Sequence, residues 1–287
     1  MGQLTMPTFE TPNPITATVT VVSGDIRVSA GDAGTTTVTV EPTDASNAED
    51  RKAAEQTRVE YTNGNLLVRA PKLRSWLPGL RGGSVDVAIE LPAASQVHAG
   101  GSLADFALSG PLGDVRLKTG LGHVQLEHAA TLTVKSGIGD INADRVAGDV
   151  DIATGSGEVR VRELASSAVI KNSNGDTWVG TAHGDLRVSS ANGNIAIDAA
   201  HASVVAKSAN GDVRLGEAVR SSVVLETSLG DLEVGIPEGT AAWLDVRATA
   251  GKVHNSLEAA AAPEPSAEKV EVRARTTAGD VVIRRAS

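Results

Sequence analysis

A turn-and-strand motif that recurs at nine-residue spacing dominates the middle of this 287-residue chain. Each copy carries small and polar residues, then glycine followed by an acidic or amide residue, and then apolar residues that alternate with variable ones. The glycine and its neighbour suit a tight turn, and the alternation is typical of a half-buried strand. A unit this short cannot bury a face alone, so the repeat predicts a solenoid of stacked coils. Copies of the motif contain Gly113, Gly122, Gly139, Gly148, Gly157, Gly175, Gly184, Gly193 and Gly211.

Several positions recur at a spacing of eighteen residues, which indicates that two motifs form one coil. Asn174, Asn192 and Asn210 follow this spacing, and each stands directly before a glycine. We therefore predict an all-β fold, a single-stranded parallel β-helix (β-solenoid) with about 18 residues per coil. The three asparagines are expected to form a structural ladder of hydrogen bonds from coil to coil, unless each one only favours its own left-handed turn. An antiparallel sandwich is disfavoured because its loops vary in length and chemistry.

The regular repeats predict three segments. Residues 111–240 are expected to form the regular solenoid, and residues 1–110 a strand-rich N-terminal cap continuous with it. A short surface helix within residues 44–56, capped by Asp44 or Ser46, is expected in this cap. Residues 241–287 are expected to form C-terminal coils and an irregular cap, with an exposed loop near residues 259–268 because of its prolines.

The overall composition excludes several classes of partner. The net charge of −9 argues against nucleic acid, which selects basic surfaces. No stretch has the roughly 18–20 apolar residues of a membrane span, and no secretion signal is visible at the start. The absence of cysteine removes disulfides and thiol chemistry. We expect a cytoplasmic protein, or an extracellular one if it is exported by a non-classical route.

The repeats offer no catalytic residues, no cofactor site and no metal site. One acidic residue per turn cannot supply the six to eight oxygens that calcium prefers, and the histidines lack paired metal spacing. One outward face could contact a ligand, because Arg160, Trp178 and Arg214 share it at multiples of eighteen residues. A plain solvated face is the alternative interpretation of these three residues.

A basic and apolar loop interrupts the acidic chain between residues 71 and 83. Arg74, Trp76, Leu77 and Arg81 are candidates for contact with a partner, because tryptophan and arginine are enriched at binding hot spots. Alternatively, the apolar residues fold back and plug the solenoid end. We expect Trp76 to belong to such a plug, with Arg74 and Arg81 at the surface.

Lys171 to Gly180, together with the surrounding Gly-Asp repeats, resembles the bacterial "putative adhesin" β-strand-repeat family, a domain of unknown function. The segments 7–12 and 81–87 resemble its actinobacterial branch, so the resemblance covers nearly the whole chain. It implies a parallel β-helix and an adhesin-like role. The family has no established catalytic residues that could be assigned to this chain.

These observations favour a non-enzymatic, adhesin-like structural or protein-interaction scaffold. One alternative is a carbohydrate-active β-helix enzyme or glycan-binding module that uses one outward face. Another is a scaffold that self-assembles through its solenoid ends. The expected partner is an unknown protein or glycan, with no nucleic acid, and the chain is expected to be a monomer or to self-associate weakly.

Overall fold

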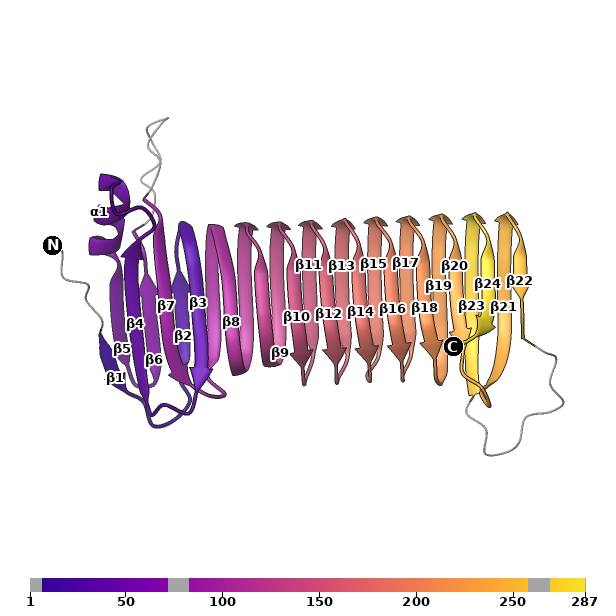
Figure 1. Ribbon diagram of the computed structural model, residues 1–287, viewed down its shortest axis with the longest axis horizontal. Helices are drawn as coiled ribbons and strands as arrows, with labels where there is room; N and C mark the ends of the chain where they lie inside the picture. Colours follow the sequence, from indigo (N-terminus) through magenta and orange to yellow (C-terminus); the bar gives the residue numbers. More distant parts are fainter. Residues whose placement is uncertain (1–6, 72–82, 258–268, 287) are drawn as a thin grey trace. The chain divides into compact units, whose positions relative to one another are not determined.

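The computed structural model describes residues 7–71, 83–257 and 269–286. It divides into two compact units, residues 1–144 (unit 1) and residues 145–287 (unit 2). Figure 1 labels the helix and the strands of each unit. Unit 1 contains β1 (Thr8–Glu10), β2 (Thr16–Thr20), β3 (Ser23–Gly31), β4 (Thr35–Pro42), α1 (Ala48–Gln56), β5 (Arg58–Thr62), β6 (Asn65–Arg69), β7 (Val85–Pro92), β8 (Gln96–Leu121) and β9 (Val124–Ile138).

The division between the units falls within β10 (Ile141–Val146). Unit 2 continues with β11 (Val150–Ser156), β12 (Val159–Leu164), β13 (Ala168–Asn174), β14 (Thr177–Ala182), β15 (Leu186–Asn192), β16 (Ile195–Ala200), β17 (Val204–Asn210), β18 (Val213–Ala218), β19 (Ser221–Leu229), β20 (Leu232–Ile236), β21 (Ala241–Ala250), β22 (Val253–Asn255), β23 (Lys269–Ala278) and β24 (Val281–Arg285).

In unit 2, each strand pairs in parallel with the strand one coil away. Val150 of β11 lies beside Ala168 of β13, and Ala168 beside Leu186 of β15. The second strand of each coil follows the same rule, with Val159 of β12 beside Thr177 of β14. Both series advance by eighteen residues from β11 to β18 and by nineteen into β19 and β20, so the predicted all-β solenoid with about 18 residues per coil is confirmed.

The interior of unit 2 is narrow and aliphatic. Strand residues alternate between buried and exposed positions, as in Val159, Arg160 and Val161 of β12. Ile152 and Ile170 are adjacent in register and fully buried. Because each inner coil buries its side chains against both neighbours, stacking supplies the burial that one motif cannot supply alone.

A column of polar side chains lies inside one corner of unit 2. Its members share one register position in successive coils, and four of them donate to the carbonyl oxygens of corner glycines. Asn172 Nδ2 donates to Gly157 O at 3.0 Å, and Ser208 Oγ donates to Gly193 O at 3.1 Å. In these coils the small polar residue at the start of the motif is therefore a partner of a turn carbonyl. The column consists of Thr154, Asn172, Ser190, Ser208, Thr227 and Thr276.

The glycine of each corner is required by both conformation and space. Gly193 has φ +140°, and a Cβ atom there would lie 2.1 Å from the carbonyl oxygen of Gly175 in the adjacent coil. Gly211 repeats this arrangement against Gly193. The left-handed conformation and the close approach of two backbones both exclude a side chain.

The last coils of unit 2 do not stack in chain order. β23 pairs in parallel with β19 on one side and with β21 on the other. In the same way, β24 lies between β20 and β22. The coil formed by residues 269–285 is therefore inserted between residues 221–236 and residues 241–255, which leaves β21 and β22 outermost (Figure 1).

Unit 1 combines parallel coils with antiparallel hairpins. β3 pairs in parallel with both β7 and β8, which aligns Ile26 with Val87 and Phe106. β4 is antiparallel to both β1 and β7, and β5 is antiparallel to β6. These hairpins explain why the nine-residue motif is degenerate at the start of the chain.

The helix α1 begins at Ala48, one residue later than a Ser46 cap would place it and three residues later than an Asp44 cap would. The predicted caps Asp44 and Ser46 were wrong, because Asn47 is the N-cap and its side chain accepts from Glu49 N. Asp44 instead accepts hydrogen bonds from the Ser46 side chain and backbone, which hold the pKa of Asp44 below its usual value. The sequence could not distinguish these caps, because the side chains of Asp44, Ser46 and Asn47 can each accept a backbone N–H.

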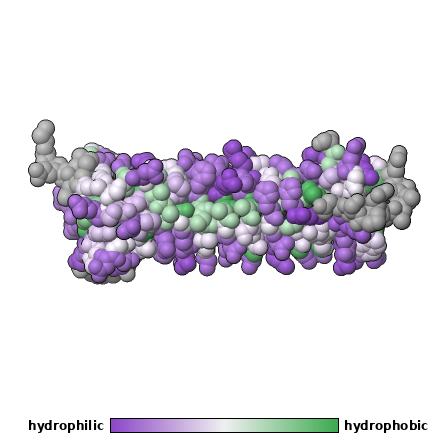
Figure 2. All heavy atoms as spheres, turned by 90° about the horizontal axis from the view of Figure 1, so that it is seen from below, coloured by the Kyte–Doolittle hydropathy of each residue, from purple (hydrophilic) through white to green (hydrophobic). Residues whose placement is uncertain are grey.

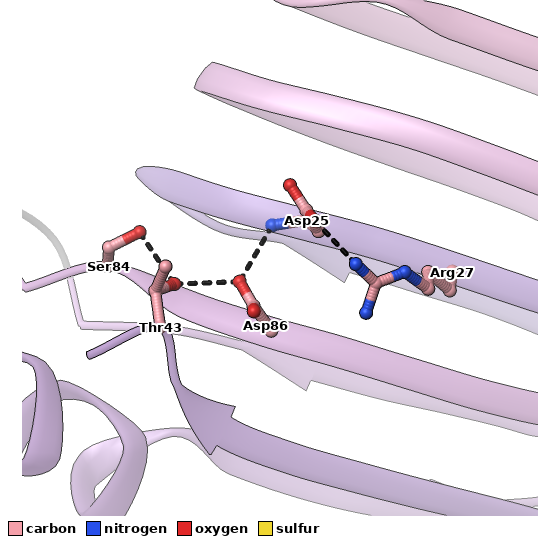
Figure 3. A network of polar contacts seen from close by, with 5 residues as sticks. All are labelled: Asp25, Arg27, Thr43, Ser84 and Asp86. Carbon is pink, nitrogen blue, oxygen red and sulfur yellow. Dashed lines mark hydrogen bonds and ion pairs between the residues drawn. The ribbon is translucent and has the colours of Figure 1, made fainter. Parts of the chain in front are cut away.

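A polar network joins Thr43, the residue directly after β4, to the neighbouring parallel strands β3 and β7 (Figure 3). Thr43 Oγ1 lies 2.9 Å from Ser84 Oγ and 2.7 Å from Asp86 Oδ1. Asp86 Oδ1 also accepts from Asp25 N. Asp50 of α1 accepts from Ser84 N, so the helix is tied to the same cluster. The network has a structural role, because its carboxylates accept backbone and hydroxyl protons within the fold.

Candidate functional site

Residues 72–82 lie outside the described part of the chain, and with them Arg74, Trp76, Leu77 and Arg81. Both interpretations of these residues, the plug and the partner contact, stay predictions. The described surface drawn in Figure 2 is hydrophilic over most of its area, with hydrophobic side chains in smaller patches. Among the described residues, the candidates for a contact site are therefore individual exposed side chains.

The structure places the three outward candidates in one row across unit 2. Arg160 of β12 is the register partner of Trp178 of β14. Trp178 is in turn beside Ala196 of β16, and Ala196 is beside Arg214 of β18. Arg160 and Trp178 are thus adjacent, whereas Arg214 lies two coils beyond Trp178.

The indole of Trp178 is held along the sheet surface. Its Nε1 donates to Asp198 Oδ1 at 3.2 Å, across to the next coil. Its Cη2 lies over Gly180, where an added Cβ would be only 3.2 Å away. Glycine at this outward position leaves room for the ring, so the half-buried indole lies beside β16 and does not project freely into solvent.

Sequence reasoning missed Asp198 and Gly180 as members of this surface. The eighteen-residue spacing could have indicated them, because one outward position recurs at this spacing. Its residues are Arg162, Gly180, Asp198 and Gly216. We define the Trp178 face by five residues. They are Arg160, Trp178, Gly180, Asp198 and Arg214.

Each arginine of the Trp178 face lies beside a carboxylate. Arg160 Nη2 is 2.7 Å from Glu158 Oε1, and Arg214 Nε is 3.6 Å from Glu233 Oε2. Glu233 also binds Arg284 of β24. The face therefore presents an aromatic ring surrounded by guanidinium groups, which donate hydrogen bonds, and carboxylates, which accept them.

The asparagines of the expected ladder lie side by side at the corner of unit 2. Asn192 Nδ2 donates to Asn174 Oδ1 at 2.9 Å, and Asn210 Nδ2 donates to Asn192 Oδ1 at 2.9 Å. All three side chains are exposed, so the row also forms a polar edge on the surface.

A second row of contacts uses the residue that follows each corner glycine. Asp176 Oδ1 accepts from Asn194 N at 2.8 Å, and Asn194 Oδ1 accepts from Asp212 N at 2.9 Å. The row continues through Asp231 and Asp280 and ends at Lys252, which donates its backbone N–H. The turn acids are thus acceptors between coils, and among the described residues no group of three or more His, Cys, Asp or Glu could hold a metal ion.

Two shallow hollows lie on other outward surfaces. In unit 1, a hollow of about 610 Å³ is lined by small and aliphatic side chains together with Arg27, Glu90, Glu127 and Asp144. In unit 2, a hollow of about 540 Å³ is lined mainly by serine and threonine with Lys207, Arg247 and Arg275. Neither lining includes an aromatic side chain, which distinguishes both hollows from the Trp178 face.

A family model described as Toastrack DUF4097 matches residues 19–284. The chain belongs to the Toastrack family. The resemblance to the adhesin repeat family of bacteria is thereby confirmed, while its actinobacterial branch stays a prediction. No curated protein matches this Toastrack chain.

Several solved structures are similar to the Toastrack chain. A "putative adhesin" from Parabacteroides distasonis has 15% identity, covering 98% of this chain and 97% of that one, with a TM-score of 0.37. A "putative lipid binding protein" from the same organism has 12% identity, with the same coverage and a TM-score of 0.40. A "putative adhesin" from Bacteroides fragilis has 11% identity, covering 99% and 98%, with a TM-score of 0.35.

No helix in the described part of this Toastrack chain is long and apolar enough to cross a membrane. The cytoplasmic location expected from the sequence stays a prediction, as does the extracellular alternative.

A carboxylate cluster in unit 1 was not predicted from the sequence. Asp114 Oδ1 accepts from Thr131 Oγ1 at 2.6 Å, and Asp114 Oδ2 lies 2.9 Å from Arg116 Nε and 3.3 Å from His98 Nε2. Partial burial acts to raise the pKa of Asp114, but the hydrogen bonds from Thr131 and His98 and the charge of Arg116 outweigh it and lower the pKa. A carboxyl group of this kind is ionised at neutral pH and cannot serve as a general acid there.

We expect Asp114 to make the stability of the chain depend on acid. Because the folded pKa is lower than the unfolded one, the folded state binds fewer protons, so this stabilisation is present above the unfolded pKa. It is lost as pH falls from about 4 through the folded pKa. The free energy of unfolding, measured by denaturant titration from pH 6 to pH 2, should fall less steeply for Asp114→Asn than for the wild type. Thr131→Val should also flatten the curve, and an unchanged slope in both variants would contradict the role of this cluster.

Proposed function

We propose that this Toastrack chain is a non-enzymatic, adhesin-like binding scaffold that contacts a glycan through the Trp178 face. The observation that carries the proposal is the indole of Trp178, which is partly exposed and held along the sheet by Asp198 and Gly180. A sugar ring has a C–H face that stacks on an aromatic ring, and its hydroxyl groups bond to carboxylates and guanidinium groups at the edge.

The arrangement of the carboxylates supports binding without turnover. Glycoside hydrolysis requires two carboxyl groups on opposite sides of the scissile bond, with one kept protonated. Here Asp198 accepts from Trp178, while Glu158 and Glu233 each lie beside an arginine of the face. Each of these carboxylates has a partner on the same coil or on the adjacent coil, which suits the positioning of a ligand.

The proposal can be tested by replacing Trp178 with alanine and measuring binding to an array of bacterial and host glycans. We expect binding to the best glycans to weaken by roughly ten-fold or more, because an aromatic anchor carries a large share of the energy at a site of this kind. Trp243→Ala is the matched control, since Trp243 is 59% exposed on the outside of β21 and lies away from the Trp178 face.

Binding that survives in Trp178→Ala but is lost in Trp243→Ala would place the site elsewhere and reject the Trp178 face. Release of new reducing ends from a bound polysaccharide would instead support the enzyme interpretation. The scaffold proposal predicts that a bound glycan is recovered at its original length.

A further inference from the structure

The outermost coil of unit 2 has an open edge. In the described part of the chain, β21 pairs in parallel with β23 and with no other strand. Leu244 and Val246 are only partly buried, although their register partners Val272 and Ala274 are fully buried. Val253 of β22 is 46% exposed, whereas its partner Val281 is fully buried. A ten-residue edge strand with an apolar inner face is a template for pairing with another chain.

The row of turn contacts could not continue into a further coil added in the same direction. Each turn residue accepts a backbone N–H from the next coil, and the row ends where Lys252 N donates to Asp280 Oδ1. A lysine side chain has no acceptor, so it cannot hold the turn of a following coil. Head-to-tail stacking into a filament would lack this contact, whereas an antiparallel partner does not need it.

The sequence of β21 is complementary to itself in an antiparallel pair. Alternation puts Leu244, Val246 and Ala248 on the inner face, with Asp245 and Arg247 on the outer face. An antiparallel register must match inner with inner positions, so the twofold axis has to pass through a residue. An axis at Asp245 or Arg247 would oppose like charges, but an axis at Val246 places Asp245 opposite Arg247 of the other copy.

The charges beside β21 favour the same register. Asp245 Oδ2 accepts from Arg275 Nη2 at 3.0 Å, whereas Arg247 has the cationic Arg275 as its register partner. No ion pair joins Arg247 to another residue in the described part of the chain. A carboxylate from a second copy would offset the repulsion between these two arginines.

We propose that a second copy of this chain pairs with the open edge of β21, antiparallel and related by a twofold axis at Val246. Asp245 of each copy then faces Arg247 of the other, and the inner faces of the two end coils cover one another. This closed dimer goes beyond the proposed glycan contact and does not depend on it.

A charge-swap experiment tests the pairing in solution. Light scattering on the full chain should give about twice the 29.3 kDa monomer mass, falling to the monomer mass on dilution. D245R and R247D should each lose the dimer, since each places like charges against one another. The double variant D245R/R247D should recover it, because the pair between copies is restored with its charges exchanged. R187D, on the outward side of an inner coil, is the control and should dimerise like the wild type.

Cysteine crosslinking tests the register independently, because the chain has no cysteine of its own. Directly opposed residues of an antiparallel pair have Cα atoms about 4.5–5.5 Å apart, which a disulfide can bridge. V246C should therefore form a disulfide-linked dimer under mild oxidation. L244C should not, since its two copies would be about 13 Å apart along the strands.

Several results would overturn the proposal. One is a wild type that stays monomeric, and another is a dimer that both single charge reversals leave intact. A third is a crosslink through L244C in place of V246C. If the wild type is monomeric and dimerises only after residues 258–268 are replaced by a glycine-serine linker, the occupant of the edge is the chain's own segment. Loss of glycan binding in Trp178→Ala, with an unchanged mass, would leave this proposal standing.

Discussion

Replacing Gly193 by alanine is expected to destabilise unit 2 by about 3 kcal/mol or more. Two costs add at this position. The φ of +140° is unfavourable for a residue with a side chain, and the new Cβ would lie 2.1 Å from the carbonyl oxygen of Gly175. The obstructing atom belongs to the backbone of a neighbouring coil, so relief requires the coils to separate. Denaturant titration followed by circular dichroism would measure the loss.

Two other glycines separate these costs. Gly239 has φ +79° with no atom within 4 Å of an added Cβ, so Gly239→Ala tests conformation alone and should cost about 1–2 kcal/mol. Gly31 also has open space and no left-handed backbone, so Gly31→Ala should change stability by less than about 0.5 kcal/mol. If Gly193→Ala costs no more than Gly239→Ala, the coils can move apart easily and the close approach is not a constraint.

The second large effect is expected from the polar column inside the corner of unit 2. Ser208→Ala removes the hydroxyl that donates to Gly193 O at 3.1 Å and leaves that carbonyl without this partner. Loss of a buried hydrogen bond of this kind should cost about 1–2 kcal/mol. The free energy of unfolding, compared under the same conditions as for the glycine variants, gives the value.

Ser190 provides a matched control one coil away in the same column. It is the register partner of Ser208, and its buried Oγ has no hydrogen-bond partner among the described residues. Ser190→Ala should therefore be neutral or slightly stabilising, because it removes a buried hydroxyl that contributes no bond. Equal losses in the two variants would show that the column acts through packing and that its hydrogen bonds add little.

The coil length could be predicted because one spacing repeats in several chemically different positions. Asn174, Asn192 and Asn210 recur together with buried aliphatic positions, and only stacking at eighteen residues aligns both. The shared row of Arg160, Trp178 and Arg214 follows from the same spacing. Position along a solenoid is thus readable from sequence wherever the coils have equal length.

Contacts that depend on unequal coils could not be predicted. Gly251 and Gly279 both carry the motif, and nothing in the motif states which of them stacks on Gly230. The contact of Asp114 with Thr131 depends on the register shift of β8 and β9 between Leu108 and Pro111. The bond from Trp178 to Asp198 depends on a side-chain rotamer, which periodicity does not determine.

The inserted position of β23 and β24 gives the order of synthesis a role in folding. On the ribosome, β21 is completed while the edge of β19 is still free, because β23 has not yet been made. Parallel pairing of β21 with β19 would place Leu244 beside Val223, an offset of 21 residues, since both pair with Val272 in the folded chain. Such a pairing would have to be undone before β23 could enter. The residues between β22 and β23 therefore set how long a premature pairing can persist, and their length becomes a kinetic parameter of this fold.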